Sequence, residues 1–86
     1  MDEIAEQQPF LIRTSIAGEI KRALSGQIKA IMNRDNISQA ELARRMGTSR
    51  AVVRRLLDDE DISVTLSTIT KTALALDLSV QIELKG

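Results

Sequence analysis

Two serines, Ser38 and Ser49, occupy positions typical of helix N-caps, and Gly47 lies between them. The stretch from Ser38 to Glu41 has the pattern of a capping box: the serine hydroxyl accepts from the Glu41 N–H, and the glutamate reaches back to the Ser38 N–H. Gly47 can adopt the left-handed backbone conformation that ends a helix. The sequence therefore predicts two short helices joined by a tight turn, the second of them over residues 50–57.

Each short helix is predicted to have one apolar side. The expected buried residues are Leu42, Ala43 and Met46 in the first helix, and Val52, Val53, Leu56 and Leu57 in the second. The residues expected to face outward from the second helix are Arg50, Ala51, Arg54 and Arg55. Two short helices with a tight turn and an arginine-rich outer face are typical of a helix-turn-helix, whose second helix fits the major groove of DNA.

The charge of the chain is segregated although its net value is zero. Residues 19–57 hold nine basic residues against three acidic ones, a net charge of +6. The flanking residues 1–18 and 58–86 carry −2 and −4, respectively. A basic central segment is the expected electrostatic footprint of a protein that contacts phosphates, although a solvated helix face would have the same composition.

The composition argues against several other functions. The chain has no Cys and no His, so neither disulfides nor the usual zinc sites are expected, and no catalytic nucleophile stands beside a base. The acidic residues 58–61 do not form an EF-hand loop, because Val64 and Thr70 stand where its glycine and glutamate would be. We expect no enzyme, metal or cofactor. No apolar run is long enough to cross a membrane and the first residues are acidic, so a cytoplasmic protein without a membrane partner is expected.

The rest of the chain is predicted to be mainly helical. Residues 1–17 are expected to form a mobile N-terminal arm, within which residues 10–16 are compatible with either a short strand or the start of a helix. A helix from about Gly18 has an apolar side, with a weak point at Ser25-Gly26 and an end near Asp35. The apolar side is Ile20, Leu24, Ile28 and Ile31, with Ala23 and Met32 beside it. Thr65 is expected to cap a last helix whose buried side is Leu66, Ile69, Ala73 and Leu76. Residues 18–77 would then form one DNA-binding domain.

Residues 78–84 alternate strictly between apolar and polar, which is typical of a half-buried strand. The apolar positions are Leu78, Val80, Ile82 and Leu84. A single strand leaves its backbone groups unpaired, so a partner strand is required. The same strand of a second copy, related by a two-fold axis, is the favoured partner, and residues 10–16 are the alternative. Residues 78–86 are therefore predicted to form a dimerisation segment.

Residues 37–57 resemble the helix-turn-helix of the XRE (Cro/CI-type) family, with Ser-Gln ahead of Glu-Leu-Ala, then Met-Gly and a capped second helix. Residues 66–80 resemble the last helix and strand of HigA/HipB-like antitoxins from type II toxin–antitoxin modules. The resemblance covers residues 24–84. It implies a mainly α, lambda-repressor-like domain of four or five helices, with one C-terminal β-strand that pairs across a homodimer.

The resemblance also implies the contacts with DNA. It implies base contacts from Ser49, Arg50, Ala51 and Arg54, and phosphate contacts from Gln39 and Arg55. Ser38 joins the phosphate contacts because it precedes the N-terminus of a helix. The sequence departs from many relatives after residue 57, where acidic residues 58–61 would repel phosphates. We expect this loop to be solvated or to face a basic partner.

The function expected from these features is that of a sequence-specific transcriptional repressor that binds an inverted-repeat operator in double-stranded DNA. The likeness of residues 66–80 implies the antitoxin of a type II module that represses its own operon. The alternatives are a module that chiefly neutralises a toxin protein, and a phage-type repressor with no toxin partner.

Overall fold

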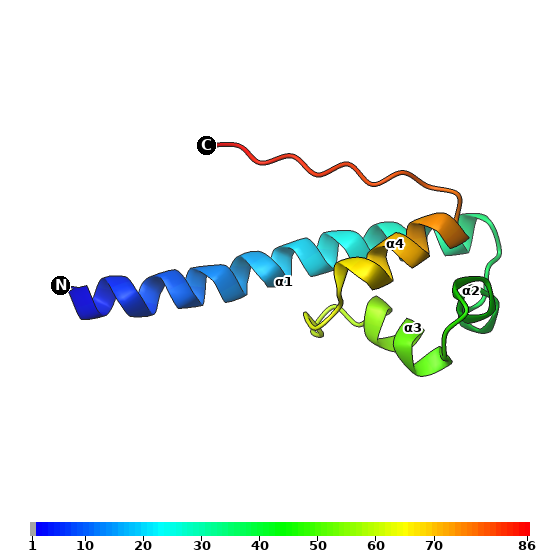
Figure 1. The fold of residues 1–86 in the computed structure, drawn as a ribbon, viewed down its shortest axis with the longest axis horizontal. Coiled ribbons are helices and arrows are strands. Elements are labelled where there is room, and N and C mark those ends of the chain that lie inside the picture. Colours follow the sequence, from blue (N-terminus) through cyan, green and yellow to red (C-terminus); the bar gives the residue numbers. More distant parts are fainter. Residues whose placement is uncertain (1) are drawn as a thin grey trace.

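The computed structural model describes the backbone of residues 2–86 and the side chains of residues 16–86. Within these residues the chain forms four helices and no strand, so the prediction of a mainly α domain is confirmed. The helices are α1 (Asp2–Arg34), α2 (Gln39–Met46), α3 (Arg50–Leu57) and α4 (Leu66–Ala75). Helix α2 packs on α3 and α4, and α3 also packs on α1 (Figure 1).

Helix α1 continues through Ser25-Gly26, so the expected weak point is not a break. Ser25 is fully buried, whereas Gly26 is exposed and has open space around it. Tertiary contacts on the Ser25 side therefore hold a turn that is weak by propensity alone. Helix α1 also includes the backbone of residues 10–16, so the alternative of a strand there is not supported. The side chains of residues 1–15 lie outside the described residues, and the mobility of residues 1–17 stays a prediction.

The buried side of α1 differs from the predicted side. Ile28 and Met32 are buried as expected, but Ile20 is 61% exposed and Ala23 is exposed. The other buried positions belong to Lys21 and Ser25, and Lys21 is only 2% exposed. The side of α1 that faces the core is therefore not its most apolar side. Lys21 and Ser25 can be buried because α3 and the loop after it accept their hydrogen bonds.

The caps of α2 and α3 are formed largely as predicted. The Ser38 hydroxyl accepts from the Glu41 N–H at 3.0 Å, and the Ser49 hydroxyl accepts from the Val52 N–H at 3.3 Å. Gly47 has φ 67°, and its N–H donates to the last turn of α2. The prediction that the Glu41 carboxylate accepts from the Ser38 N–H is wrong. This carboxylate accepts hydrogen bonds from arginines of its own helix.

The core joins α1, α2, α3 and the residue that caps the end of α4. Its buried apolar residues are Ile28, Met32, Leu42, Ala43, Met46, Val53, Leu56, Leu57 and Leu76. The predicted apolar sides of α2 and α3 are thus correct, with Val52 only half-buried. The prediction for α4 is wrong at Leu66, which is 74% exposed, whereas Thr72 is buried. The Thr72 hydroxyl donates to the Thr68 carbonyl at 2.8 Å and so loses little by burial.

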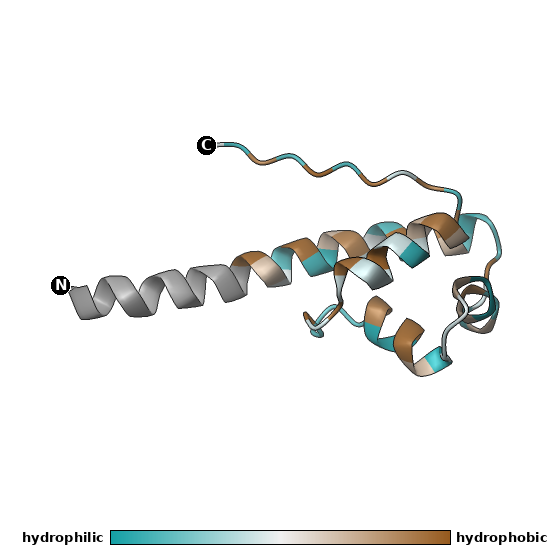
Figure 2. Cartoon of the chain, viewed as in Figure 1, coloured by the Kyte–Doolittle hydropathy of each residue, from teal (hydrophilic) through white to brown (hydrophobic). Residues whose placement is uncertain are grey.

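Residues 78–84 are extended after α4 and follow the direction of α1 back towards its N-terminal end (Figure 1). Figure 2 shows the alternation of apolar and polar residues along this segment. In the described chain no strand is assigned here, and residues 79–86 make no backbone hydrogen bond. The predicted strand is therefore not formed within the described residues, because a strand requires a hydrogen-bonded neighbour and residues 79–86 have none there.

Between this segment and helices α1 and α4 lies an open groove of about 360 Å³. Ile20 and Ile31 line its α1 side, and Val80 and Ile82 line the opposite side. The exposed fractions of Ile20, Val80 and Ile82 are 61%, 51% and 74%. The groove therefore leaves a large part of these apolar side chains in contact with solvent.

Candidate nucleic-acid interface

The outer face of α3 presents the residues that the sequence predicted for base contact. Ser49, Arg50, Ala51 and Arg54 are all exposed, as is Arg55 at the edge of the same face. On the opposite face Val53 and Leu56 are at most 1% exposed. The burial of this apolar side fixes the side of α3 that can meet a partner, because a rotation of the helix would expose its core residues.

The guanidinium groups of this face are available for contacts with another molecule. Among the described residues, Arg50, Arg54 and Arg55 form no ion pair and no side-chain hydrogen bond. Arginine binds guanine O6 and N7 through a bidentate fork, which requires such an unengaged guanidinium. The first turn of α3 contains no acidic residue, so nothing in that turn opposes an approaching phosphate.

The start of α2 has a different arrangement of charge. Ser38 and Gln39, the predicted phosphate contacts, are both exposed. Glu41 in the same turn accepts from Arg44 Nη2 at 2.5 Å and from Arg45 Nε at 2.8 Å. These hydrogen bonds from Arg44 and Arg45 lower the pKa of Glu41 from 4.5 to about 2. The glutamate is therefore ionised, and the two arginines offset its repulsion of phosphate.

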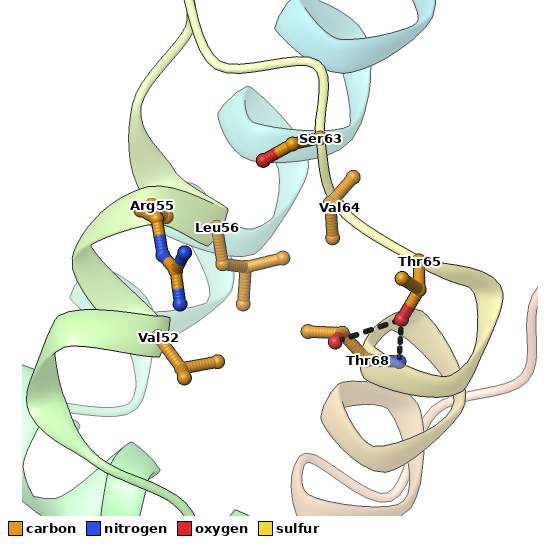
Figure 3. Close-up of a pocket in the computed structure, with 7 residues that line it drawn as sticks. All are labelled: Val52, Arg55, Leu56, Ser63, Val64, Thr65 and Thr68. Atoms are coloured by element: carbon orange, nitrogen blue, oxygen red, sulfur yellow. Dashed lines mark hydrogen bonds between the residues drawn. The ribbon is translucent and has the colours of Figure 1, made fainter.

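Arg55 lines a pocket that it shares with residues at the start of α4. Figure 3 shows it beside a small open pocket between α3 and the start of α4. The pocket has a volume of about 210 Å³ and is lined by Val52, Arg55, Leu56, Ser63, Val64, Thr65 and Thr68. The Thr65 hydroxyl, which caps α4, accepts from the Thr68 N–H at 3.2 Å. Arg55 thus lies close to the N-terminus of α4.

The acidic loop is bound to the domain by contacts that the sequence did not predict. Asp59 accepts hydrogen bonds from the Ser25 hydroxyl and, at 3.3 Å, from Lys29 Nζ. These contacts lower the pKa of the Asp59 carboxyl, with the Ser25 hydrogen bond as the larger cause. Asp61 accepts from the Ser63 N–H at 2.8 Å, and the hydrogen bonds from Ser63 lower the pKa of the Asp61 carboxyl. Asp59 is therefore attached to α1, which the sequence did not predict, while the side-chain hydrogen bonds of Asp61 stay within the loop.

A second contact missed by the sequence analysis is that of Lys21. Its ammonium group donates to the backbone carbonyls of Arg55, Asp58 and Asp61. The signal in the sequence is the placement of Lys21 and Ser25 at the same helical spacing as Ile28 and Met32. A lysine in line with core residues indicates a buried partner, although its spacing does not identify that partner.

In the part of the chain that the structure describes, no group of three or more acidic residues could hold a metal ion. Among the same residues, no helix combines the length and apolar character needed to cross a membrane. The interface on α3 consists of exposed cations, a hydroxyl and a methyl group on a helix. Such groups can bind phosphates and base edges.

Two capped helices joined at Gly47, with the second presenting arginines to solvent, define a helix-turn-helix DNA-binding domain. Residues 27–81, more than half of the chain, match the Cro/C1-type HTH DNA-binding domain, and the protein belongs to this family. This match confirms the resemblance to the XRE family. The family consists of regulatory DNA-binding proteins. Comparisons with curated proteins and with solved structures gave no significant match.

Proposed function

We propose that the protein is a dimeric transcriptional repressor in which α3 of each copy enters the major groove of an operator. Ser49, Arg50, Ala51 and Arg54 make the base contacts. The observation that carries the proposal is the outer face of α3, where exposed arginines have no ion-pair partner among the described residues. A protein with this role acts in the cytoplasm, where its DNA is.

Phosphate contacts flank the base contacts in this proposal. Ser38 and Gln39 bind one phosphate at the start of α2, where unpaired backbone N–H groups favour an anion. Arg55 binds another phosphate, since its side chain is exposed and lines the pocket beside the start of α4. These contacts fix the position of α3 in the groove without contributing to sequence recognition.

The proposed dimer forms by pairing of residues 78–84 from two copies. The backbone of residues 79–86 lacks hydrogen-bond partners in the described chain, and Ile82 and Leu84 are 74% and 93% exposed. Antiparallel pairing would satisfy the backbone groups and cover these apolar side chains. A dimer of this kind places two recognition helices about 34 Å apart and requires an inverted-repeat operator.

A second proposed function, binding of a toxin protein, is supported by apolar residues on α4. Leu66 and Leu74 are 74% and 76% exposed, and neither belongs to the proposed DNA contacts. Exposed apolar residues favour a protein partner. Together with the antitoxin likeness of residues 66–80, they support an antitoxin that also represses its own operon. A toxin-like reading frame next to the gene would favour this role, and its absence would favour a phage-type repressor.

The proposed repressor function is tested by selecting binding sites for the full-length protein from random duplex DNA. We expect one enriched motif in two inverted halves, with centres separated by one turn of B-DNA. Recovery of sequences without a common motif would overturn sequence-specific binding. A single, unrepeated half-site would retain base recognition and overturn the symmetric dimer.

A further inference from the structure

We propose that Lys21 is a positioning residue for DNA recognition: its buried ammonium group fixes the C-terminal end of α3 on α1 and so sets the angle at which α3 meets the base edges. The inference rests on the proposed DNA-binding function. It assigns a role in base discrimination to a residue that lies outside the predicted DNA contacts.

The geometry of Lys21 is that of a three-point anchor. Its Nζ donates to the carbonyl of Arg55 at 2.9 Å, of Asp58 at 2.6 Å and of Asp61 at 2.5 Å. An ammonium group has three donor hydrogens, so these carbonyls use its full capacity. The Arg55 carbonyl also accepts the Asp58 N–H at 3.3 Å, and the Asp58 carbonyl accepts the Asp61 N–H at 3.2 Å, so the ammonium group uses the second lone pair of each. A cation at the C-terminal end of a helix is also favoured by the helix dipole.

Two further contacts join the same parts of the chain. Ser25 and Lys29 follow Lys21 at intervals of four residues, so all three lie on one side of α1. Ser25 and Lys29 both bind the Asp59 carboxylate. The loop after α3 is therefore held along two turns of α1, with Lys21 at the end nearest the helix carbonyls.

The anchor acts at the C-terminal end of α3, next to Arg54, whereas the other predicted base contacts, Ser49, Arg50 and Ala51, lie at its start. The start of α3 follows the turn in which the Thr48 N–H donates to the Ala43 carbonyl of α2 at 2.9 Å. The end of α3 has Leu56 and Leu57 in the core and the polar anchor at Lys21. Apolar packing is non-directional, whereas three hydrogen bonds to one ammonium group specify an orientation.

The use of a charged residue here supports a positional role. Burial of an ammonium group is costly, and an apolar residue of similar size can be as stabilising in a core. The three carbonyls compensate this cost only in one arrangement of α1 and α3. Bidentate recognition by Arg50 and Arg54 depends on placement within roughly 0.5 Å, so a small tilt of α3 would weaken it.

The test compares full-length protein with Lys21→Met, which keeps a long unbranched side chain and removes the ammonium group. Affinities are measured for the selected operator duplex and for a scrambled duplex of equal length, at a temperature where circular dichroism shows each protein folded. We expect the ratio of the two affinities to fall roughly tenfold, because base contacts are lost while phosphate contacts persist. Leu76→Ala, a core change at the C-terminal end of α4, is the control for lost stability and should leave the ratio unchanged.

An unchanged ratio in Lys21→Met, or an equal fall in Leu76→Ala, would overturn the positional role. If Lys21→Met does not fold, Ser25→Ala combined with Asp59→Asn loosens the same loop, and the ratio should then fall by a smaller factor; an unchanged ratio there would also overturn it. Failure of the wild-type protein to distinguish the two duplexes would instead refute the proposed sequence-specific function.

Discussion

The carboxylate of Glu41 lies 2.8 Å from the Nε of Arg45, one turn further along α2. Arg44 also donates to this carboxylate, so both arginines are hydrogen-bonded to Glu41 within their own helix. Not every cation of the segment is therefore equally available to DNA. The arginines of α3, which form no ion pair with any described residue, differ from those of α2 in this respect.

Glu41→Gln is expected to strengthen DNA binding without regard to sequence, because it removes one negative charge and releases Arg44 and Arg45. If one of them reaches a phosphate, the plot of log affinity against log salt concentration should become steeper by about 1. Fluorescence anisotropy on a scrambled duplex at several salt concentrations measures this slope. An unchanged slope and affinity would show that neither arginine reaches the duplex.

Arg50→Ala is expected to weaken operator binding by roughly 1–3 kcal/mol and to relax the preference at one base pair. The physical reason is the loss of one bidentate pair with a guanine. Arg22→Ala removes the same charge from the exposed surface of α1 and serves as the matched control. Equal losses for operator and scrambled duplexes in Arg50→Ala would mean that Arg50 binds phosphate only.

Ser49→Ala is expected to lower the free energy of unfolding by about 1 kcal/mol, since the hydroxyl that accepts from the Val52 N–H is lost. Urea unfolding followed by circular dichroism gives this value. Ser67→Ala on the exposed surface of α4, where the serine forms no hydrogen bond with described side chains, should change stability little. Equal effects of the two substitutions would contradict a capping role for Ser49.

The Asp59 contacts predict a dependence of stability on pH. Because the pKa of Asp59 is lowered in the folded protein, its contribution is complete above the ordinary carboxyl pKa of 3.8. That contribution is lost as the pH falls from this value through the lowered pKa. Asp59→Asn should therefore show a smaller decline of the melting temperature between neutral and acidic pH than the wild type.

Glu60→Gln is the control for this pH dependence, because Glu60 is an exposed acid in the same loop. Thermal melts of both variants over the same pH series make the comparison. We expect Glu60→Gln to follow the wild-type curve. Superimposable curves for Asp59→Asn and the wild type would show that the contacts with Ser25 and Lys29 do not stabilise the fold.

Ile82→Pro is expected to convert the proposed dimer into monomers, because proline removes a backbone donor from the middle of the pairing segment. Light scattering coupled to size exclusion measures the mass. Gly86→Pro places the same residue beyond the predicted strand and should remain dimeric. A dimer that persists in Ile82→Pro would locate the interface in another part of the chain.

Much of the helix-turn-helix could be predicted because its signals are local. Ser38, Gly47 and Ser49 act on backbone groups within a few residues of themselves, so their effects follow from sequence spacing. The outward face of α3 follows from the helical period, which separates Arg50 and Arg54 from Val53 and Leu56. These local features are enough to place the candidate interface on α3 without any tertiary contact.

The orientation of α1 was decided by tertiary structure alone. The apolar spacing favoured burial of Ile20, whereas the structure buries Lys21 and Ser25 because both find partners in the loop after α3. Those partners are more than thirty residues away and are mostly backbone carbonyls, which carry no mark in the sequence. The sequence by itself thus determined the local caps and the helix faces, while the packing of distant segments determined which polar groups could be buried, since burial depends on the partners that the fold brings together.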